Sequence, residues 1–218
     1  LARLEPLRGN NLLTLRLQAV EGGLVDHAWV QSVRLRKDLP SRLLVEIVEY
    51  RPSAVVTTSE LRYWAASDGQ VIAPVDVEDP GLLGVELDAS AFVPAPEPGR
   101  RSRTVAAALE TAGEMLVLGE VWGRRLESIM VLGPEDYELR FADTEWSVRV
   151  RPGDLEARWT FLERLLPRLE ERYDRFETVD LRFSRRVVLQ GAETDRPPSP
   201  EVAAQDVELE ISGTDRPL

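Results

Sequence analysis

Alternation of hydrophobic and polar residues is the clearest pattern in the first part of the chain. It occurs twice within residues 29–56, on either side of the Lys-Asp-Leu-Pro-Ser run at 37–41. A period of two is typical of half-buried strands, and a turn with Asp and Pro joins such strands. The sequence therefore predicts a β-hairpin, carried by Val33, Leu35, Leu43, Val45 and Ile47.

Upstream of this hairpin, residues 13–24 have leucine and valine at helical spacing. The pair Gly22-Gly23 interrupts them, and adjacent glycines weaken a helix. We therefore expect two short helical turns there. Residues 2–8, before the turn signal at 9–11, are expected to form a short strand.

A different order of patterns follows in the middle of the chain. Residues 61–73 contain Asp68-Gly69 between two strand-like runs, a dipeptide typical of tight hairpins. Residues 104–117 are rich in helix formers, and residues 125–151 show period-two patterning three times. We expect a hairpin, then a helix and three antiparallel strands. Residues 74–84, interrupted by Gly and Pro, are expected to be a surface loop.

From Asp154 onward, hydrophobic residues recur along one face of a helix that Pro167 is expected to kink. Strand candidates at 178–183 and 187–189 follow this helix. The helical face is made of Leu155, Trp159, Leu162, Leu166, Leu169 and Tyr173.

These patterns predict an α+β fold in two domains. The first, residues 1–57, has a small sheet with two short helices. The second, residues 58–190, is a larger mixed β domain with two helices and an exposed C-terminal edge strand. Residues 191–218 are rich in Pro, Asp, Glu and Ser, so we expect a disordered tail.

Composition excludes several classes of function. The net charge of −11 disfavours non-specific nucleic-acid binding, because phosphates repel an acidic surface. The sequence has no cysteine, which excludes disulfides and classical structural zinc sites. No hydrophobic run approaches the ~20 residues needed to span a bilayer. Because the chain starts at Leu1, we expect it to be a fragment whose targeting segment was removed.

The sequence offers few candidates for catalysis. His27, beside Asp26, is the only histidine, and we interpret it as a surface residue. Asp76, Glu78 and Asp79 lack the alternation of a calcium loop, so a solvated acidic loop is the favoured interpretation. Phosphate-binding loops and nucleophile elbows are absent from the sequence. We expect no enzyme activity, no cofactor and no metal.

A basic strip, Arg34, Arg36 and Lys37, lies on the first predicted hairpin. Charge of this kind either keeps the surface soluble or meets anionic lipid head groups or a partner.

Three segments together resemble the FtsQ/DivIB family of bacterial cell-division proteins. In residues 29–56 the resemblance is a W-V pair, an apolar-Pro turn and a strand that ends in E-x-x-P. The hairpin WAASDGQVI at 64–72 and the element VDLRF at 179–183 follow in the family's order. The likeness covers approximately residues 1–190. The positions that match in the first segment are Trp29, Val30, Leu39, Pro40, Leu43, Glu49, Pro52 and Ala54.

The resemblance implies a polypeptide-transport-associated (POTRA) domain followed by a β domain. It also implies a transmembrane helix before Leu1, with these residues on the periplasmic side of the inner membrane at the division septum. The family binds FtsB and FtsL and helps to control septal peptidoglycan synthesis without catalysing it. The expected partners of this chain are therefore FtsB-like and FtsL-like divisome proteins.

By the same resemblance, the partner site is expected at the last strands, where an exposed edge accepts a partner strand. Arg182 is expected to pair with a partner carboxylate. The assigned residues are Arg182, Phe183, Ser184, Val187, Val188 and Leu189.

Two alternatives stay open at this stage. One is a POTRA-type chaperone or transport module that binds extended polypeptides. The other, a more remote one, is a cell-wall hydrolase that uses paired carboxylates.

Overall fold

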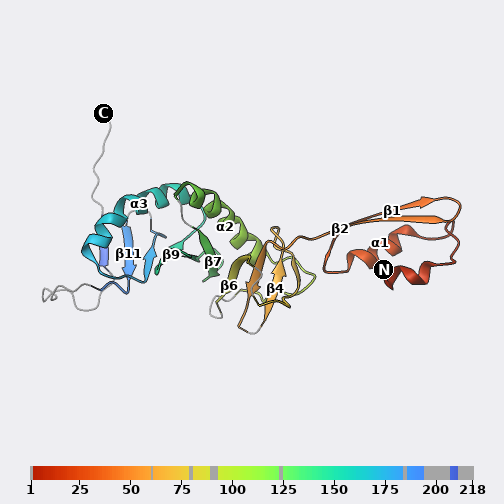
Figure 1. The fold of residues 1–218 in the computed structure, drawn as a ribbon, viewed down its shortest axis with the longest axis horizontal. Helices are drawn as coiled ribbons and strands as arrows, with labels where there is room; N and C mark the ends of the chain where they lie inside the picture. Colours follow the sequence, from red (N-terminus) through yellow and green to blue (C-terminus); the bar gives the residue numbers. More distant parts are fainter. Residues whose placement is uncertain are drawn as a thin grey trace, which may run out of the picture.

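The molecule is elongated, with a small hairpin region at one end and a large sheet at the other (Figure 1). The computed structural model describes the positions of most of the chain. The described residues are 2–59, 61–78, 81–88, 93–122, 125–183, 186–193 and 207–210.

The hairpin region consists of a 3₁₀ helix η1 (Ala2–Leu7), a helix α1 (Leu17–Val25) and strands β1 (Val30–Asp38) and β2 (Arg42–Glu49). The two strands pair antiparallel, with Val33 opposite Ile47, which confirms the predicted hairpin.

Two expectations for the start of the chain are wrong. Residues 2–7 form η1 rather than a strand, and its half-buried Leu4 and Leu7 are three apart, the spacing that aligns side chains on a 3₁₀ helix. Helix α1 continues through Gly22-Gly23. Its contact with β1 supplies the packing that low intrinsic propensity lacks.

The large sheet has ten strands in the order β12-β11-β10-β9-β8-β7-β6-β3-β4-β5. Three neighbouring pairs are parallel, namely β10 with β9, β3 with β6, and β6 with β7. The strands are β3 (Ala54–Thr57), β4 (Arg62–Ala65), β5 (Val71–Pro74), β6 (Leu83–Leu87), β7 (Leu126–Val131), β8 (Tyr137–Phe141), β9 (Ser147–Val150), β10 (Thr178–Asp180), β11 (Arg186–Gln190) and β12 (Val207–Glu210).

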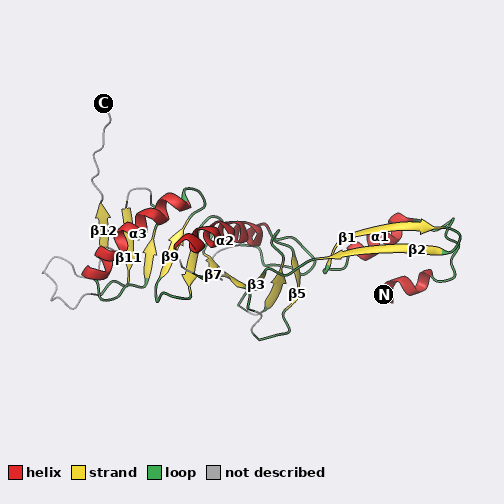
Figure 2. Cartoon of the chain, turned by 45° about the horizontal axis from the view of Figure 1, so that its top comes forward, coloured by secondary structure: helices red, strands yellow, loops and turns green. Residues whose placement is uncertain are grey.

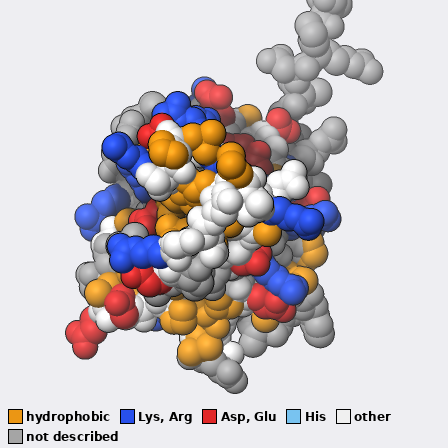
Figure 3. Space-filling model, turned by 90° about the vertical axis from the view of Figure 1, so that its right-hand side faces the viewer, with side chains coloured by type: hydrophobic (Ala, Val, Ile, Leu, Met, Phe, Trp, Pro, Cys, Tyr) orange, Lys and Arg blue, Asp and Glu red, His pale blue; other side chains and the backbone are white. Residues whose placement is uncertain are grey.

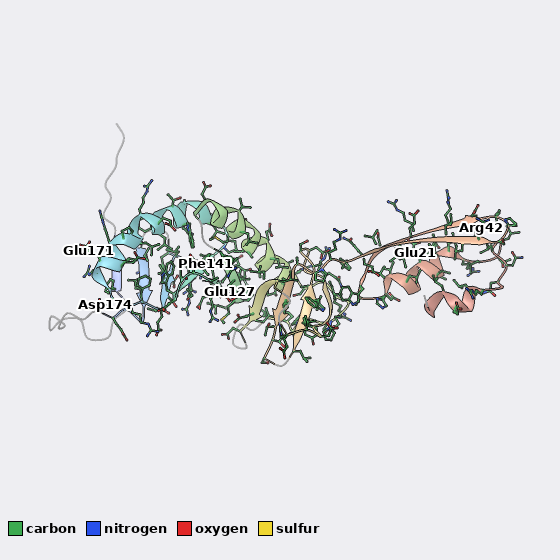
Figure 4. The ribbon with its side chains drawn as sticks, in the orientation of Figure 1. Glu21, Arg42, Glu127, Phe141, Glu171 and Asp174 are labelled. Carbon is green, nitrogen blue, oxygen red and sulfur yellow. The ribbon has the colours of Figure 1, made fainter. Side chains whose placement is uncertain are left out.

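Helices α2 (Arg103–Trp122) and α3 (Leu155–Arg172) cover one face of this sheet (Figures 1 and 2). The core lies between the two layers. Trp159 of α3 packs against Phe141 of β8, with ring centroids 5.1 Å apart, and Phe141 is labelled in this layer in Figure 4. The α+β fold, with two helices on a larger mixed sheet, is confirmed.

The middle of the chain follows the predicted order with one omission. The hairpin β4–β5 turns at Gly69, whose φ is +82°. A Cβ atom at this position would lie 2.6 Å from the Ser102 carbonyl oxygen, so only glycine fits the turn. The omission is β6, of which the first two residues fall in the predicted loop 74–84.

The two sheets separate between Tyr50 and Ser53. The Tyr50 amide donates to the Trp29 carbonyl in the small region, whereas the Ser53 amide donates to Ala65 in the large one. Strand β3, assigned to the first domain by the boundary at residue 57, pairs with β4 and β6. The exact boundary stays a prediction.

The predicted tail, residues 191–218, differs from expectation at its described positions, where Glu193 forms an antiparallel bridge with Arg175. Residues 207–210 form β12, which pairs antiparallel with β11. An edge strand has unpaired main-chain groups, and the alternating V-E-L-E run has the period of a strand. Residues 194–206 and 211–218 lie outside the described residues, so the expectation of disorder there is untested.

Candidate partner-binding site at the end of the sheet

Three of the six residues assigned to partner binding, Val187, Val188 and Leu189, lie in strand β11, and the other three follow β10 in sequence. β10 pairs parallel with β9 and antiparallel with β11. Within β11, Val187 and Leu189 are buried in the core, while Val188 between them is half-buried. The two buried side chains anchor the strand, so its main chain and its opposite face are the parts that are not packed in the core. Ser184 lies outside the described residues.

Arg182 lies just after β10, and its guanidinium is already paired within the chain. Its Nη2 lies 2.6 Å from Oδ2 of Asp180, and its Nε lies 3.0 Å from Oδ1. The Arg182 main-chain amide also donates to Asp180 Oδ1 at 3.0 Å. Asp180 is only 2% exposed, so this is a largely desolvated pair. The structure therefore shows Arg182 engaged within the chain, and its expected pairing with a partner carboxylate stays a prediction.

A second carboxylate, from the residue just before β8, completes this cluster. Asp136 Oδ2 accepts from Arg182 Nη1 at 3.2 Å, and Asp136 Oδ1 accepts from Arg151 Nε at 2.5 Å. The hydrogen bond from Arg151, followed by the charge of Arg182, lowers the pKa of Asp136 below its usual value. The hydrogen bond that Arg182 donates to Asp180 raises the pKa of Arg182. Both groups are held in their charged forms.

Helix α3 fixes the same segment from the other side. Arg158 Nη1 donates to the Leu181 carbonyl oxygen at 3.0 Å, and Leu181 itself is buried. The residues that follow β10 are thus held by contacts from β8 and α3. Asp136 and Arg158 were not predicted as part of the site, because nothing in the local sequence marks them. Asp180 was detectable, since it lies two residues before an arginine in the VDLRF element.

Phe183 is the exposed aromatic residue at this end of the sheet. It is 39% exposed, and the Arg186 guanidinium carbon lies 4.4 Å from its ring centroid. A cation over an aromatic face is a favourable contact that orients both side chains. Phe183 and Val188 therefore offer apolar surface beside the sheet edge, and the cluster around Arg182 holds that surface in place.

The structure does not bring the three basic residues of the hairpin together. Arg34 and Arg36 are exposed on one face of β1, opposite Glu46 and Leu44 of β2. Lys37 lies on the other face, because successive strand residues alternate, and its Nζ donates to the Leu13 carbonyl at 3.4 Å. Figure 3, which views this end of the molecule, shows basic side chains interspersed with hydrophobic ones. The membrane or partner role stays a prediction.

The other candidate groups are His27 and the acidic residues at 76–79, which the structure describes in part. His27 is exposed, and its Nδ1 accepts the Trp29 amide at 3.4 Å. Within the described part of the chain, the structure has no group of three or more His, Cys, Asp or Glu residues placed to hold a metal. Asp79 lies outside the described residues. None of the described helices is long and apolar enough to cross a membrane.

The lowered pKa of Asp136 makes a testable contribution to stability. A carboxyl group whose pKa is depressed by folding stabilises the protein above its unfolded pKa of about 3.9. This stabilisation is lost as the pH falls through the folded value. We expect Asp136→Asn to lower the free energy of unfolding by about 1 kcal/mol at pH 7. The difference from wild type should shrink below about pH 4.

Urea denaturation at a series of pH values measures this difference. Glu97→Gln is the control, because Glu97 forms an exposed ion pair with Arg100 at 3.1 Å, and such pairs contribute little. A constant difference between wild type and Asp136→Asn from pH 7 to pH 3 contradicts the expectation.

Comparison with known proteins agrees with the resemblance read from the sequence. Residues 1–50 match the family described as POTRA domain, FtsQ-type. A protein named cell division protein FtsQ, from Anaeromyxobacter sp. (strain K), is 30% identical over 187 residues, which cover 82% of this chain and 60% of the relative. The FtsQ of Myxococcus fulvus is 32% identical over 108 residues, covering 48% of this chain and 37% of its own.

A third relative of the same name, from Geotalea daltonii, is 23% identical over 185 residues, or 83% of this chain and 66% of its own. The chain thus spans less than two thirds of the length of each of these relatives. The first and third of these matches nevertheless cover more than four fifths of this chain. The chain belongs to the FtsQ family of cell-division proteins.

Proposed function

We propose that this chain is a non-catalytic scaffold of bacterial cell division, which binds FtsB-like and FtsL-like partners by adding a partner strand to the C-terminal edge of its large sheet. It acts at the division septum, on the extracytoplasmic side of the cytoplasmic membrane. The relatives named as cell-division proteins support a role of this chain in cell division. The geometry of β11 supports the mode of binding.

One observation carries this proposal: the outer edge of β11 pairs with an antiparallel strand, β12. The edge thus accepts antiparallel main-chain pairing over Arg186–Leu189, the length of a short recognition strand. Strand addition obtains affinity from main-chain hydrogen bonds and specificity from neighbouring side chains. Phe183 and Val188 supply apolar contact at this edge, while buried Val187 and Leu189 keep the strand rigid.

Binding of the extracytoplasmic segment of an FtsB-like protein tests the proposal. We expect Phe183→Ala to weaken this binding by about tenfold or more, because exposed aromatic residues often dominate interface energies and a central one contributes about 2 kcal/mol. Isothermal titration calorimetry gives the affinity directly. The folded state of the variant is checked by circular dichroism.

Leu116→Ala is the matched control. Leu116 is a similarly exposed apolar residue, at 46%, but it lies on helix α2. The Leu116→Ala substitution should leave the affinity for the FtsB-like segment unchanged. Equal loss in both variants, or no binding by the wild-type chain, would overturn the proposal.

A further inference from the structure

Strand β12 occupies the edge at which a partner strand would add. It pairs with β11 over four residues, and residues 191–206 connect the two strands in sequence. Figure 2 shows β12 at the outer end of the sheet, beside β11. The register places Val207 opposite Leu189, Glu208 opposite Val188, Leu209 opposite Val187, and Glu210 opposite Arg186.

The sequence of β12 suits this position. Its V-E-L-E run alternates apolar and acidic residues, the period-two pattern typical of a strand. The two apolar residues, Val207 and Leu209, lie opposite the buried Leu189 and Val187 in register. Glu210 lies opposite Arg186, and opposite charges in directly paired positions favour a register.

We infer that β12 is an intramolecular occupant of the partner site, which a partner strand must displace before it pairs with β11. The inference rests on the proposed function, because it treats this edge as the partner site. The occupant also defines the chemistry of the strand that replaces it: a short extended segment with alternating apolar and acidic residues. Such a strand would pair its acidic residue with Arg186.

The expected size of the effect follows from effective concentration. A segment joined by a short linker acts on its own chain at a concentration of about 1 mM, when the linker spans the distance. If the free segment binds the open edge with a Kd of about 0.1 mM, the state in which β12 occupies the edge is about tenfold more populated than the open state. A competing strand then binds the whole chain about tenfold more weakly than it binds a chain without β12.

The test uses a double variant, Glu208→Pro with Leu209→Pro. Proline removes a main-chain donor and does not fit a paired strand, and two consecutive prolines disrupt the pairing whichever residue donates to β11. The control places the same prolines at Thr214 and Asp215, beyond the paired residues. The probe is a fluorescently labelled peptide of residues 205–212, measured by fluorescence anisotropy against the full chain.

We expect the probe to bind the Glu208→Pro, Leu209→Pro variant about tenfold more tightly than it binds wild type or the control. Hydrogen exchange of β11 amides should also be faster in this variant without the probe, and slow again when the probe is added. Equal affinity of the probe for the variant and for wild type overturns the inference. The inference is also overturned if the probe binds neither of these chains.

The probe comes from this chain, so the result does not depend on a divisome partner. If the probe displaces β12 but an FtsB-like segment binds neither chain, the proposed partner is wrong. The inference that β12 occupies the edge of β11 then still holds. If the FtsB-like segment binds both chains equally, the site is real and β12 does not regulate it.

Discussion

Replacing Asp180 with alanine is expected to lower the free energy of unfolding by about 3 kcal/mol. Asp180 is 2% exposed, and it is held by the Arg182 guanidinium and amide. Removing one member of a desolvated ion pair leaves the other charge poorly compensated, which costs far more than an exposed pair contributes. Asp136 still contacts Arg182 in the variant, which keeps the loss towards the lower end of the usual range.

A double-mutant cycle separates this pairing from general disruption of the strand. Arg182→Met removes the charge and keeps much of the side chain, so the double variant Asp180→Ala with Arg182→Met carries no orphaned cation. We expect its loss of stability to be smaller than the sum of the single losses, by about 1.5 kcal/mol or more. Urea denaturation monitored by circular dichroism measures all three variants. Additive losses, or a loss below 1 kcal/mol for Asp180→Ala, would contradict the expectation.

Under the proposed function, the same cluster connects stability with partner binding. Asp180, Asp136 and Arg158 act on the two residues, Leu181 and Arg182, that precede Phe183. Phe183 is thus exposed on a segment whose main chain and neighbouring side chain are fixed. Preorganisation of this kind lowers the entropy lost on binding. We infer that variants which loosen the cluster weaken partner binding even when the fold persists.

The sequence was sufficient for elements that depend on local pattern. The first hairpin followed from alternation around the turn at 37–41, and α3 from the helical recurrence of leucines with Trp159. Both patterns are set by one partly buried face, so they are visible without knowledge of distant contacts. The strand predicted at 178–183 is also present but shorter, because β10 ends at Asp180.

Elements that depend on distant contacts were harder to predict. Strand β6 lies between the parallel neighbours β3 and β7, and its sequence begins within a Gly/Pro-punctuated stretch that resembles a loop. Strand β12 is a short run in a tail whose composition is typical of disorder. In each case the partner strand, rather than local propensity, decides the conformation.

The candidate site likewise contains features that the local sequence indicates and features that depend on distant contacts. Phe183 and Val188 were assigned from the resemblance, and the structure gives both of them solvent exposure at the edge. The pairing of Arg182 with Asp136 joins residues 46 positions apart, so local sequence could not reveal that Arg182 is already engaged. A motif identifies which residues belong to a site, but tertiary contacts decide whether each one faces a partner or supports its neighbours.

Trp159→Ala is expected to lower the free energy of unfolding by about 3–5 kcal/mol, the usual cost of removing a buried aromatic side chain. Trp159 is 1% exposed and contacts Phe141 across the layer between α3 and the sheet. The cavity would lie beneath the helix that carries Arg158, one residue away, so the contact from Arg158 to Leu181 should weaken as well.

Trp159→Phe is the matched variant, because it keeps an aromatic ring against Phe141 and should lose less stability. Urea denaturation followed by circular dichroism avoids relying on tryptophan fluorescence. If α3 positions the partner site as argued, partner binding should fall in the order wild type, Trp159→Phe, Trp159→Ala under conditions in which all three are folded. Full partner binding by a destabilised but folded Trp159→Ala would show that the site is held by the cluster around Asp180 and Asp136 alone.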